Sequence, residues 1–241
     1  MSLDLAVETP KIAIEGSELN KGSRTFELAL VLFVALSQPL LNSSYVFIYG
    51  SKNSATYSNF HYLFMIVHEV GSLLLLWYVL SRSGRTFSSL GLRISFRGFL
   101  SGLGLVAGAF VVYFFAWYLV QFVHKLFFGA YLAVHSPSFS FPRASWALVV
   151  PMLLLNPLFE ELIVRGYLMT ELRERTGSTF LAVAASALIQ ASYHLYQGLP
   201  AATCLLAGFL VLSTYYARTK NLFPPVIAHL AADLRLLSLI R

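Results

Sequence analysis

Charged side chains are scarce in this chain. Only 12% of its 241 residues are Asp, Glu, Lys or Arg, whereas 57% are hydrophobic. Because a soluble domain normally carries about 25% charged residues, the composition predicts a protein whose main solvent is the lipid bilayer. The net charge is +6, but no Lys/Arg-rich run could follow a phosphate backbone, so we expect no nucleic-acid partner.

Several familiar chemistries are excluded by missing residues. The single cysteine, Cys204, excludes an internal disulfide framework. The only two aspartates, Asp4 and Asp233, exclude an intramembrane aspartic dyad near the middle of the chain. The sequence contains no His-Glu-x-x-His zinc helix, no Gly-x-Ser-x-Gly nucleophile elbow and no glycine-rich phosphate loop. Residues 1–24 do not read as a signal peptide, and we expect a polar, cytoplasmic tail there.

Apolar segments fill most of the remaining chain. A membrane-spanning helix needs about 20 mostly apolar residues, and the segments near that length are 28–48, 60–80, 99–123, 146–170, 179–196, 200–217 and 222–240. They predict an all-α, polytopic transmembrane helical bundle of about seven spans, formed by residues 25–241. No internal repeat is visible, so an inverted-repeat transporter gains no support.

The positive charges indicate an orientation. With a cytoplasmic amino terminus, that side collects Lys11, Lys21, Arg24, Arg82, Arg85, Arg93, Arg97, Arg173, Arg175, Arg218 and Lys220. The opposite side collects Lys52, Lys125, Arg143, Arg235 and Arg241. Since cytoplasmic loops are enriched in Lys and Arg, we predict a cytoplasmic amino terminus.

Three charged residues interrupt the fourth apolar segment: Glu160, Glu161 and Arg165. Each costs roughly 2.5 to 3.5 kcal/mol at the centre of a membrane, so a function is expected of them. Glu161 and Arg165 are four residues apart, share a helix face and are predicted to pair. Glu160 points about 100° away and faces another partner. The alternative is an ion pair that only holds helices together.

Two later segments carry histidines. His194 follows an apolar helix, where a lone histidine is often a hydrogen-bonded packing residue. His229 and Asp233 are one turn apart, and a carboxylate beside an imidazole can fix its tautomer. Each position alone has a structural explanation, but together with Glu160 they predict one polar site within the bilayer. His68 and Glu69, in the second segment, stay unassigned.

Straight spans would place the two histidines at different depths. At about 1.5 Å per residue, His194 lies near the outer end of its segment and His229 nearer the inner end of its own. The site therefore requires strongly tilted helices, or a fifth segment that is short and partly re-entrant.

These motifs resemble a known family. Glu160-Glu161-x-x-x-Arg165, His194 and His229-x-x-x-Asp233 are similar to the three motifs of the CAAX prenyl protease 2/bacteriocin-processing intramembrane proteases, also called the CPBP or ABI family. The motif-bearing core covers about residues 145–240, and Ser89-Leu90-Gly91-Leu92 fits as well. Two positions depart from the family pattern: Gln190 replaces a usual phenylalanine, and Asp233 stands where asparagine is common.

The resemblance implies an intramembrane endopeptidase that hydrolyses a hydrophobic or lipidated peptide. Glu160 would activate a water that His194 helps to hold, while His229 and Asp233 stabilise the oxyanion; Glu161 and Arg165 would be structural. A metal such as zinc, held by Glu160, His194 and His229, is the alternative within the family. We expect an integral protein of a prokaryotic cell membrane. The alternatives from other classes are a transporter and a non-proteolytic immunity or binding protein.

Overall fold

A computed structural model describes residues 11–50, 58–132 and 145–237. The first ten residues of the predicted tail and residues 133–144, which connect the third and fourth apolar segments, lie outside these ranges. The described residues are mostly helical, and they contain no strand. The helices are α1 (Lys11–Tyr49), α2 (Asn59–Arg82), η1 (Phe87–Leu90), α3 (Phe96–Phe128), α4 (Trp146–Glu160), η2 (Glu161–Leu168), α5 (Met169–Thr176), α6 (Thr179–Ser192), η3 (Leu195–Gln197), α7 (Leu199–Thr219) and α8 (Phe223–Leu237).

Five helical stretches are long and apolar enough to cross a membrane: 22–49, 59–82, 96–128, 146–176 and 199–219. The two remaining predicted spans, 179–196 and 222–240, are the short helices α6 and α8. At about 1.5 Å per residue, helices of roughly 15 residues fall short of a hydrocarbon core about 30 Å thick. The polytopic helical bundle is confirmed, with short helices at the two places that carry the histidines.

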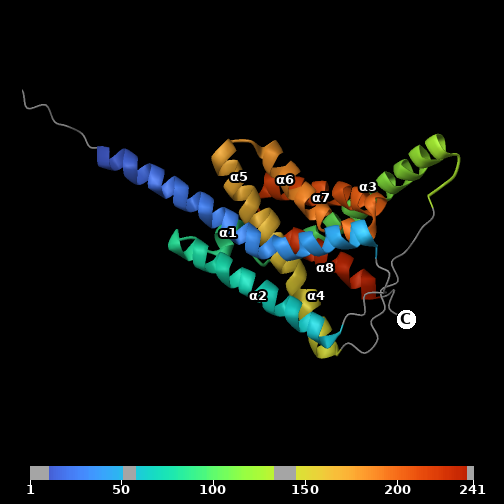
Figure 1. The fold of residues 1–241 in the computed structure, drawn as a ribbon, viewed down its shortest axis with the longest axis horizontal. Helices are drawn as coiled ribbons and strands as arrows, with labels where there is room; N and C mark the ends of the chain where they lie inside the picture. Colours follow the sequence, from blue (N-terminus) through green and yellow to red (C-terminus); the bar gives the residue numbers. More distant parts are fainter. Residues whose placement is uncertain (1–10, 51–57, 133–144, 238–241) are drawn as a thin grey trace, which may run out of the picture.

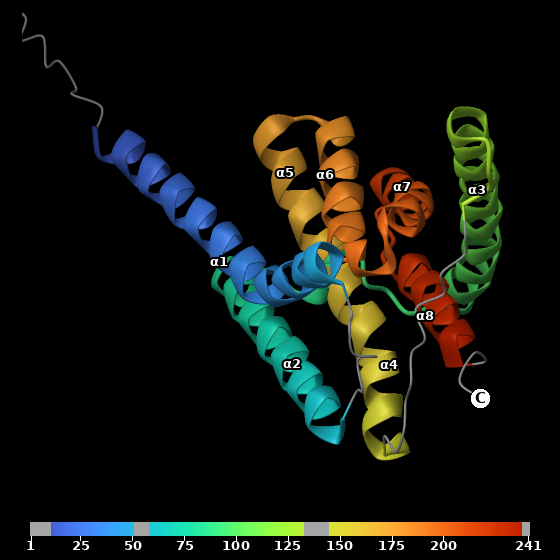
Figure 2. The ribbon, with the colours of Figure 1, turned by 45° about the vertical axis from the view of Figure 1, so that its right-hand side comes forward.

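The continuous helix α4–η2–α5 runs through the middle of the molecule (Figures 1 and 2). α1 and α2 lie on one side of it, and α8, α7 and α3 lie on the other. α6 packs between α5 and α7. The central helix carries the first motif, and the segments that carry the other two motifs, α6 with its following turn and α8, pack against it.

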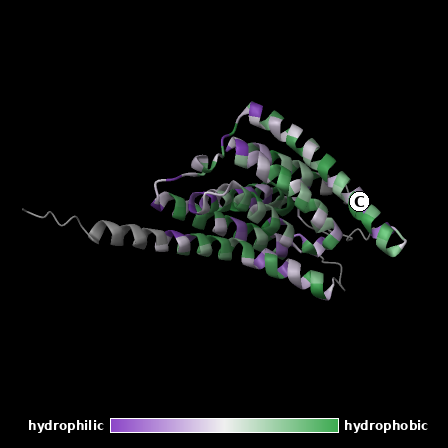
Figure 3. Cartoon of the chain, turned by 90° about the horizontal axis from the view of Figure 1, so that it is seen from above, coloured by the Kyte–Doolittle hydropathy of each residue, from purple (hydrophilic) through white to green (hydrophobic). Residues whose placement is uncertain are grey.

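Hydrophobic residues are frequent along the helices (Figure 3), and many of their side chains are exposed. On α3 alone, Phe115, Tyr118, Phe122 and Phe127 are each more than half exposed. An exposed apolar surface of this extent is unfavourable in water and is what a helix surrounded by lipid requires. Together with the long apolar helices, it shows an integral membrane protein.

Small residues bring α3 against α8. A side chain on Gly102 would place its Cβ 2.6 Å from the Cβ of Ile227, and one on Gly98 would lie 2.9 Å from the ring of Phe223. The spacing Gly98-x-x-x-Gly102 is the small-x-x-x-small pattern that lets membrane helices approach closely. Since α8 carries His229 and Asp233, this contact determines where those two side chains lie.

One end of the bundle is rich in ion pairs. Glu171 in α5 is buried and accepts hydrogen bonds from Arg85 (2.6 Å), Arg24 (3.2 Å) and Arg175 (3.4 Å). Arg24 belongs to α1, which begins at Lys11, so residues 11–24 of the predicted tail are helical. The physical reason is that no proline follows Pro10 until Pro39, and nothing stops the apolar helix from extending outward.

Candidate active site

The central helix changes its winding at the charged motif. Pro151 and Pro157 lie inside α4, and each removes a backbone N–H from the helical hydrogen-bond ladder. Immediately after Glu160 the chain forms a π-helix, η2, from Glu161 to Leu168. π-Helical turns are rare and frequent at functional sites. Every residue of η2 is buried, so this segment is the centre of the core rather than a lipid-facing surface.

Glu161 and Arg165 form the predicted ion pair, and neither side chain is exposed. Arg165 also donates from Nε to the hydroxyl of Ser213 on α7 at 3.2 Å, and its guanidinium lies 5.7 Å from the centre of the Phe209 ring. A buried guanidinium is tolerated only when its N–H groups have partners. Arg165 therefore connects the central helix with α7.

Gln190, the departure from the family pattern, completes this network. Its Oε1 accepts a hydrogen bond from Nη2 of Arg165, and its Nε2 donates to Oε2 of Glu160 at 3.1 Å. A phenylalanine could make neither bond. Gln190 thus connects the buried Glu161–Arg165 pair with the adjacent glutamate.

Glu160 faces a different set of groups from Glu161. Its Oε2 accepts hydrogen bonds from the hydroxyl of Tyr193 at 2.6 Å and from Gln190. Its residual exposure is 8%. No protein donor in the described part of the chain bonds its second oxygen, Oε1. One oxygen is therefore fixed by the protein while the other is available to a small molecule such as water.

His229 lies between the two glutamates. Its Nδ1 is 2.9 Å from Oε1 of Glu161, and its Nε2 is 3.8 Å from both Oε2 of Glu160 and Oδ1 of Asp233. The carboxylate that orients the imidazole is thus that of Glu161, not that of Asp233. Asp233 instead accepts a hydrogen bond from Asn156 Nδ2 at 3.4 Å. Nε2 is left to point toward the space between Glu160 and Asp233.

His194 lies beyond the end of α6, in the turn before η3. Its Nδ1 bonds the carbonyl oxygen of Gln190 at 2.8 Å, and its ring contacts that of Phe209 with centroids 5.2 Å apart. Because the carbonyl oxygen of Gln190 can only accept, the neutral ring carries its proton on Nδ1. With its proton on Nδ1, Nε2 is an acceptor. Ser43 of α1 fixes this turn by bonding Ser192 O (3.1 Å) and Tyr196 N (3.0 Å).

The short α6 resolves the depth problem raised by the sequence. Because α6 ends at Ser192, the chain turns back inside the bundle and His194 does not reach the far surface. His194 is close enough to Glu160, His229 and Asp233 for their charges to interact. The four residues predicted to be catalytic therefore lie in one region, on three different elements.

The predicted metal ligands do not form a preformed metal site. Within residues 11–50, 58–132 and 145–237, no three His, Cys, Asp or Glu side chains are grouped as metal ligands would be. Glu160 and His229 meet at 3.8 Å, but the oxygen of Glu160 nearest to His229 is already hydrogen-bonded by Tyr193 and Gln190. The described residues hold no preformed metal site, and we derive no step through a metal.

Four site residues were not identified as such from the sequence. Tyr193 and Asn156 adjoin motif residues, but an isolated hydroxyl or amide is no signal. Gln190 was noticed only as a departure. Glu69 on α2 is buried, interacts electrostatically with Glu160 and Asp233, and has one carboxylate oxygen without a hydrogen-bond partner in the described structure. The position of Glu69 within an apolar span was the sequence feature that could have indicated its place in the site. Its neighbour His68 instead packs on Phe159 and bonds Val34 O at 2.9 Å.

This fold and this cluster define a class: a polytopic helical membrane protein with carboxylates and histidines gathered in its buried interior. Comparison with known families specifies it further. Residues 142–235 match the family described as Rce1-like, the type II CAAX prenyl endopeptidases. The resemblance inferred from the motifs is confirmed by this match, and the matched segment contains all six predicted site residues. No curated protein and no solved structure matches the chain significantly.

Proposed function

We propose that the protein is an intramembrane endopeptidase that hydrolyses a peptide bond in a hydrophobic or lipidated peptide. The family match supports peptide hydrolysis. The observation that carries the mechanism is the position of Glu160: one carboxylate oxygen is held by two donors, and the imidazole Nε2 of His229 lies 3.8 Å from it. A buried base beside a fixed donor is the arrangement that general base catalysis requires.

In this mechanism Glu160 removes a proton from a water through its free Oε1. The water oxygen attacks the scissile carbonyl carbon, and the carbonyl oxygen becomes an oxyanion. Nε2 of His194, an acceptor in the neutral ring, helps to hold the water. The protonated Glu160 then transfers its proton to the leaving amine nitrogen as the C–N bond breaks, so the carboxylate is restored for the next turnover.

His229 stabilises the oxyanion from the other side. Nδ1–H of the imidazole donates to Glu161. Nε2 can then donate toward the space beside Asp233 only in the imidazolium form, which the neighbouring carboxylates of Glu160, Glu161 and Asp233 favour. Glu161 and Arg165 do not contact the substrate and act as positioning residues. A donor that is fixed before the reaction costs no reorganisation when charge develops, which is the source of its catalytic effect.

Cleavage of a lipidated model peptide by purified protein tests this function. We expect Glu160→Gln to lower turnover by at least about 100-fold, as loss of a general base does, while the melting temperature stays near that of the wild type. Glu27→Gln is the matched control, because Glu27 forms an ion pair with Arg82 (3.1 Å) and lies outside the site. Normal turnover by Glu160→Gln would refute the assignment of the base.

The same assay distinguishes a metal-dependent reaction from one in which a glutamate activates the water. We expect the wild type to keep its activity after incubation with a chelator. Loss of activity that returns on addition of zinc would instead assign a metal to Glu160, His194 and His229. Absence of cleavage under all conditions, with intact folding, would favour a non-proteolytic binding protein or transporter.

A further inference from the structure

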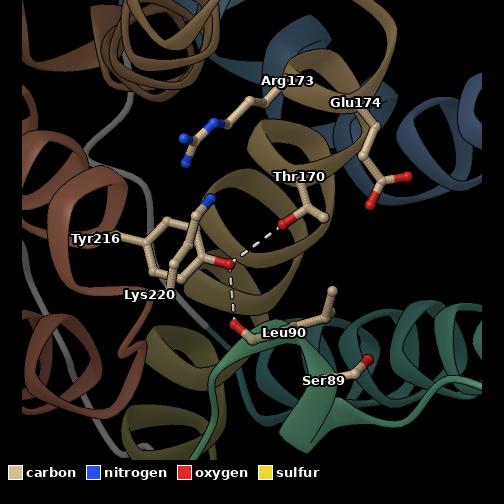
Figure 4. A pocket seen from close by; sticks show the side chains of 7 residues that line it. All are labelled: Ser89, Leu90, Thr170, Arg173, Glu174, Tyr216 and Lys220. Carbon is tan, nitrogen blue, oxygen red and sulfur yellow. Dashed lines mark hydrogen bonds between the residues drawn. The ribbon is translucent and has the colours of Figure 1, made fainter. Parts of the chain in front are cut away.

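A second polar site lies at the ion-pair-rich end of the bundle, away from the candidate active site. It is a cavity of about 440 Å³ between η1, α5 and the end of α7. Its lining residues are Ser89, Leu90, Thr170, Arg173, Glu174, Tyr216 and Lys220 (Figure 4). Arg173 is thirteen residues after Glu160 on the same continuous helix, about 20 Å at 1.5 Å per residue. The cavity is therefore too far from Glu160 to hold the peptide bond that is cleaved.

Two cations converge on the mouth of this cavity. Figure 4 shows the guanidinium of Arg173 and the amine of Lys220 pointing toward each other above the Tyr216 ring. Nζ of Lys220 lies 5.2 Å from the centre of that ring. Partial burial and the nearby charge of Arg173 lower the pKa of Lys220. Both side chains are exposed, so a ligand can reach them.

Neither cation has a carboxylate partner in the described part of the chain. The nearest acid, Glu174, points away from both (Figure 4) and accepts a hydrogen bond from Arg24 at 2.6 Å. This distinguishes the pair from Arg24, Arg85 and Arg175, which all bond Glu171. Two like charges held together without a counterion are an arrangement that an anion stabilises.

The frame that holds the two cations is rigid. The hydroxyl of Tyr216 donates to Leu90 O at 2.9 Å and meets the Thr170 hydroxyl at 3.2 Å, so the floor of the cavity is fixed. Lys220 has a positive φ of 52°, unusual for a residue other than glycine. Its carbonyl oxygen lies only 2.2 Å from where a Cβ on Gly91 would be. Gly91 itself has φ 88°, and its carbonyl accepts a hydrogen bond from Leu222 N at 2.9 Å.

The location favours a phosphate that belongs to a lipid. The cavity opens where α2, α5 and α7 end, and helix ends in a spanning bundle lie at the level of the lipid headgroups. Anionic lipids are concentrated at that surface and attract Lys and Arg. Arg173 can offer two N–H groups to phosphate oxygens, and Lys220 adds a point charge.

We propose that the cavity binds the phosphate group of an anionic phospholipid between Arg173 and Lys220. The bound headgroup connects α5, the continuation of the helix that carries Glu160, with α7, whose Ser213 holds Arg165. Lipid binding therefore stabilises the two helices that build the candidate active site, and it does so without contact with the substrate.

Lipid binding by the purified protein tests this site. Native mass spectrometry and thermal shift would compare phosphatidylglycerol with phosphatidylcholine for the wild type, Arg173→Gln, Lys220→Gln and the double variant. We expect each single substitution to weaken phosphatidylglycerol binding about tenfold, as loss of one charge-assisted hydrogen bond does. The zwitterionic lipid should give no comparable shift.

Arg218→Gln is the matched control. This substitution removes the same charge from the same helix end. Arg218, however, lines a separate groove between α3 and α7. An equal effect of Arg218→Gln would show attraction by net charge alone and would overturn the proposal. So would inorganic phosphate, if it raised the melting temperature as much as phosphatidylglycerol with the same dependence on Arg173 and Lys220. The readout is binding, so its outcome is independent of whether the protein cleaves peptides.

Discussion

At the scale of single residues, the interior is organised around the need to give each buried charge a partner. Arg165 has Glu161, Gln190 and Ser213 around it, and Glu160 has Tyr193 and Gln190. A charge left without partners in a medium of low dielectric constant is far more costly than a paired one. The polar side chains of Gln190, Ser213 and Tyr193 thus reduce the energetic cost of burying the charged motif.

Gln190 provides a test of this reading. Gln190→Leu keeps the volume but removes one acceptor from Arg165 and one donor from Glu160. We expect the free energy of unfolding to fall by about 1–3 kcal/mol, the cost of leaving buried polar groups unsatisfied, measured as a lower melting temperature in detergent. Gln197→Leu is the control, since the Gln197 amide donates to the Tyr196 hydroxyl at 3.0 Å and, in the described structure, bonds neither Arg165 nor Glu160. Equal melting temperatures for the two variants would mean that the bridge contributes no stability.

Asp233 provides the second prediction at this scale. It lies 3.8 Å from His229 Nε2, too far for a direct hydrogen bond, and its firmest partner is the Asn156 amide. We expect Asp233→Asn to keep substantial peptidase activity, because an amide can also donate to an oxyanion, whereas Asp233→Ala loses most of it. Rates of both variants between pH 6 and about 9 would measure this. An Asn variant as inactive as the Ala variant would show that the negative charge is needed.

At the scale of elements, two departures from a regular helix create the site. The π-helix η2 begins at Glu161 and changes the direction in which the following side chains point. The short helix α6 ends at Ser192, so His194 lies in the turn that follows it, next to Tyr193, which bonds Glu160. Between them, α8 has to approach closely enough for His229 to bond Glu161, and the small residues of α3 permit this.

The approach of α3 to α8 can be tested with one methyl group. Gly102→Ala would place a Cβ 2.6 Å from Cβ of Ile227, so α8 has to shift. We expect a lower melting temperature and a loss of peptidase activity of about tenfold or more, because small displacements of catalytic groups are costly. Gly104→Ala is the matched control on the same helix, since nothing lies within 4 Å of its Cβ position. Equal activity of the two variants would show that α8 is not positioned by this contact.

At the scale of the whole molecule, charge and apolar surface define an orientation. The ends of α2, α5 and α7 carry the arginine-rich network around Glu171 and the proposed phosphate site. The opposite ends of α2 and α4 meet through Asn59, whose Oδ1 accepts from Ser145 N at 2.8 Å. We expect the arginine-rich end, together with the amino terminus, to face the cytoplasm.

Cysteine labelling of intact cells measures this orientation. The only native cysteine, Cys204, is fully buried and gives little background. Ser81→Cys, at the end of α2, should react with a membrane-impermeant maleimide only after permeabilisation. Ala130→Cys, beyond the end of α3, should react in intact cells because α3 runs the other way. The reverse pattern would place the arginine-rich end outside.

The sequence alone determined the membrane environment, the helical class and the three motifs, because these depend on composition and on local spacing. The Glu161–Arg165 pair was also accessible from sequence, since residues four apart share a helix face. The sequence could not determine that α6 and α8 are short, because apolar residues continue beyond the ends of both helices. It could not assign Glu161 rather than Asp233 to His229, or Gln190 and Glu69 to the neighbourhood of Glu160. Those contacts join helices far apart in the chain, and only the packing of α2, α6 and α8 against the central helix decides which side chains meet.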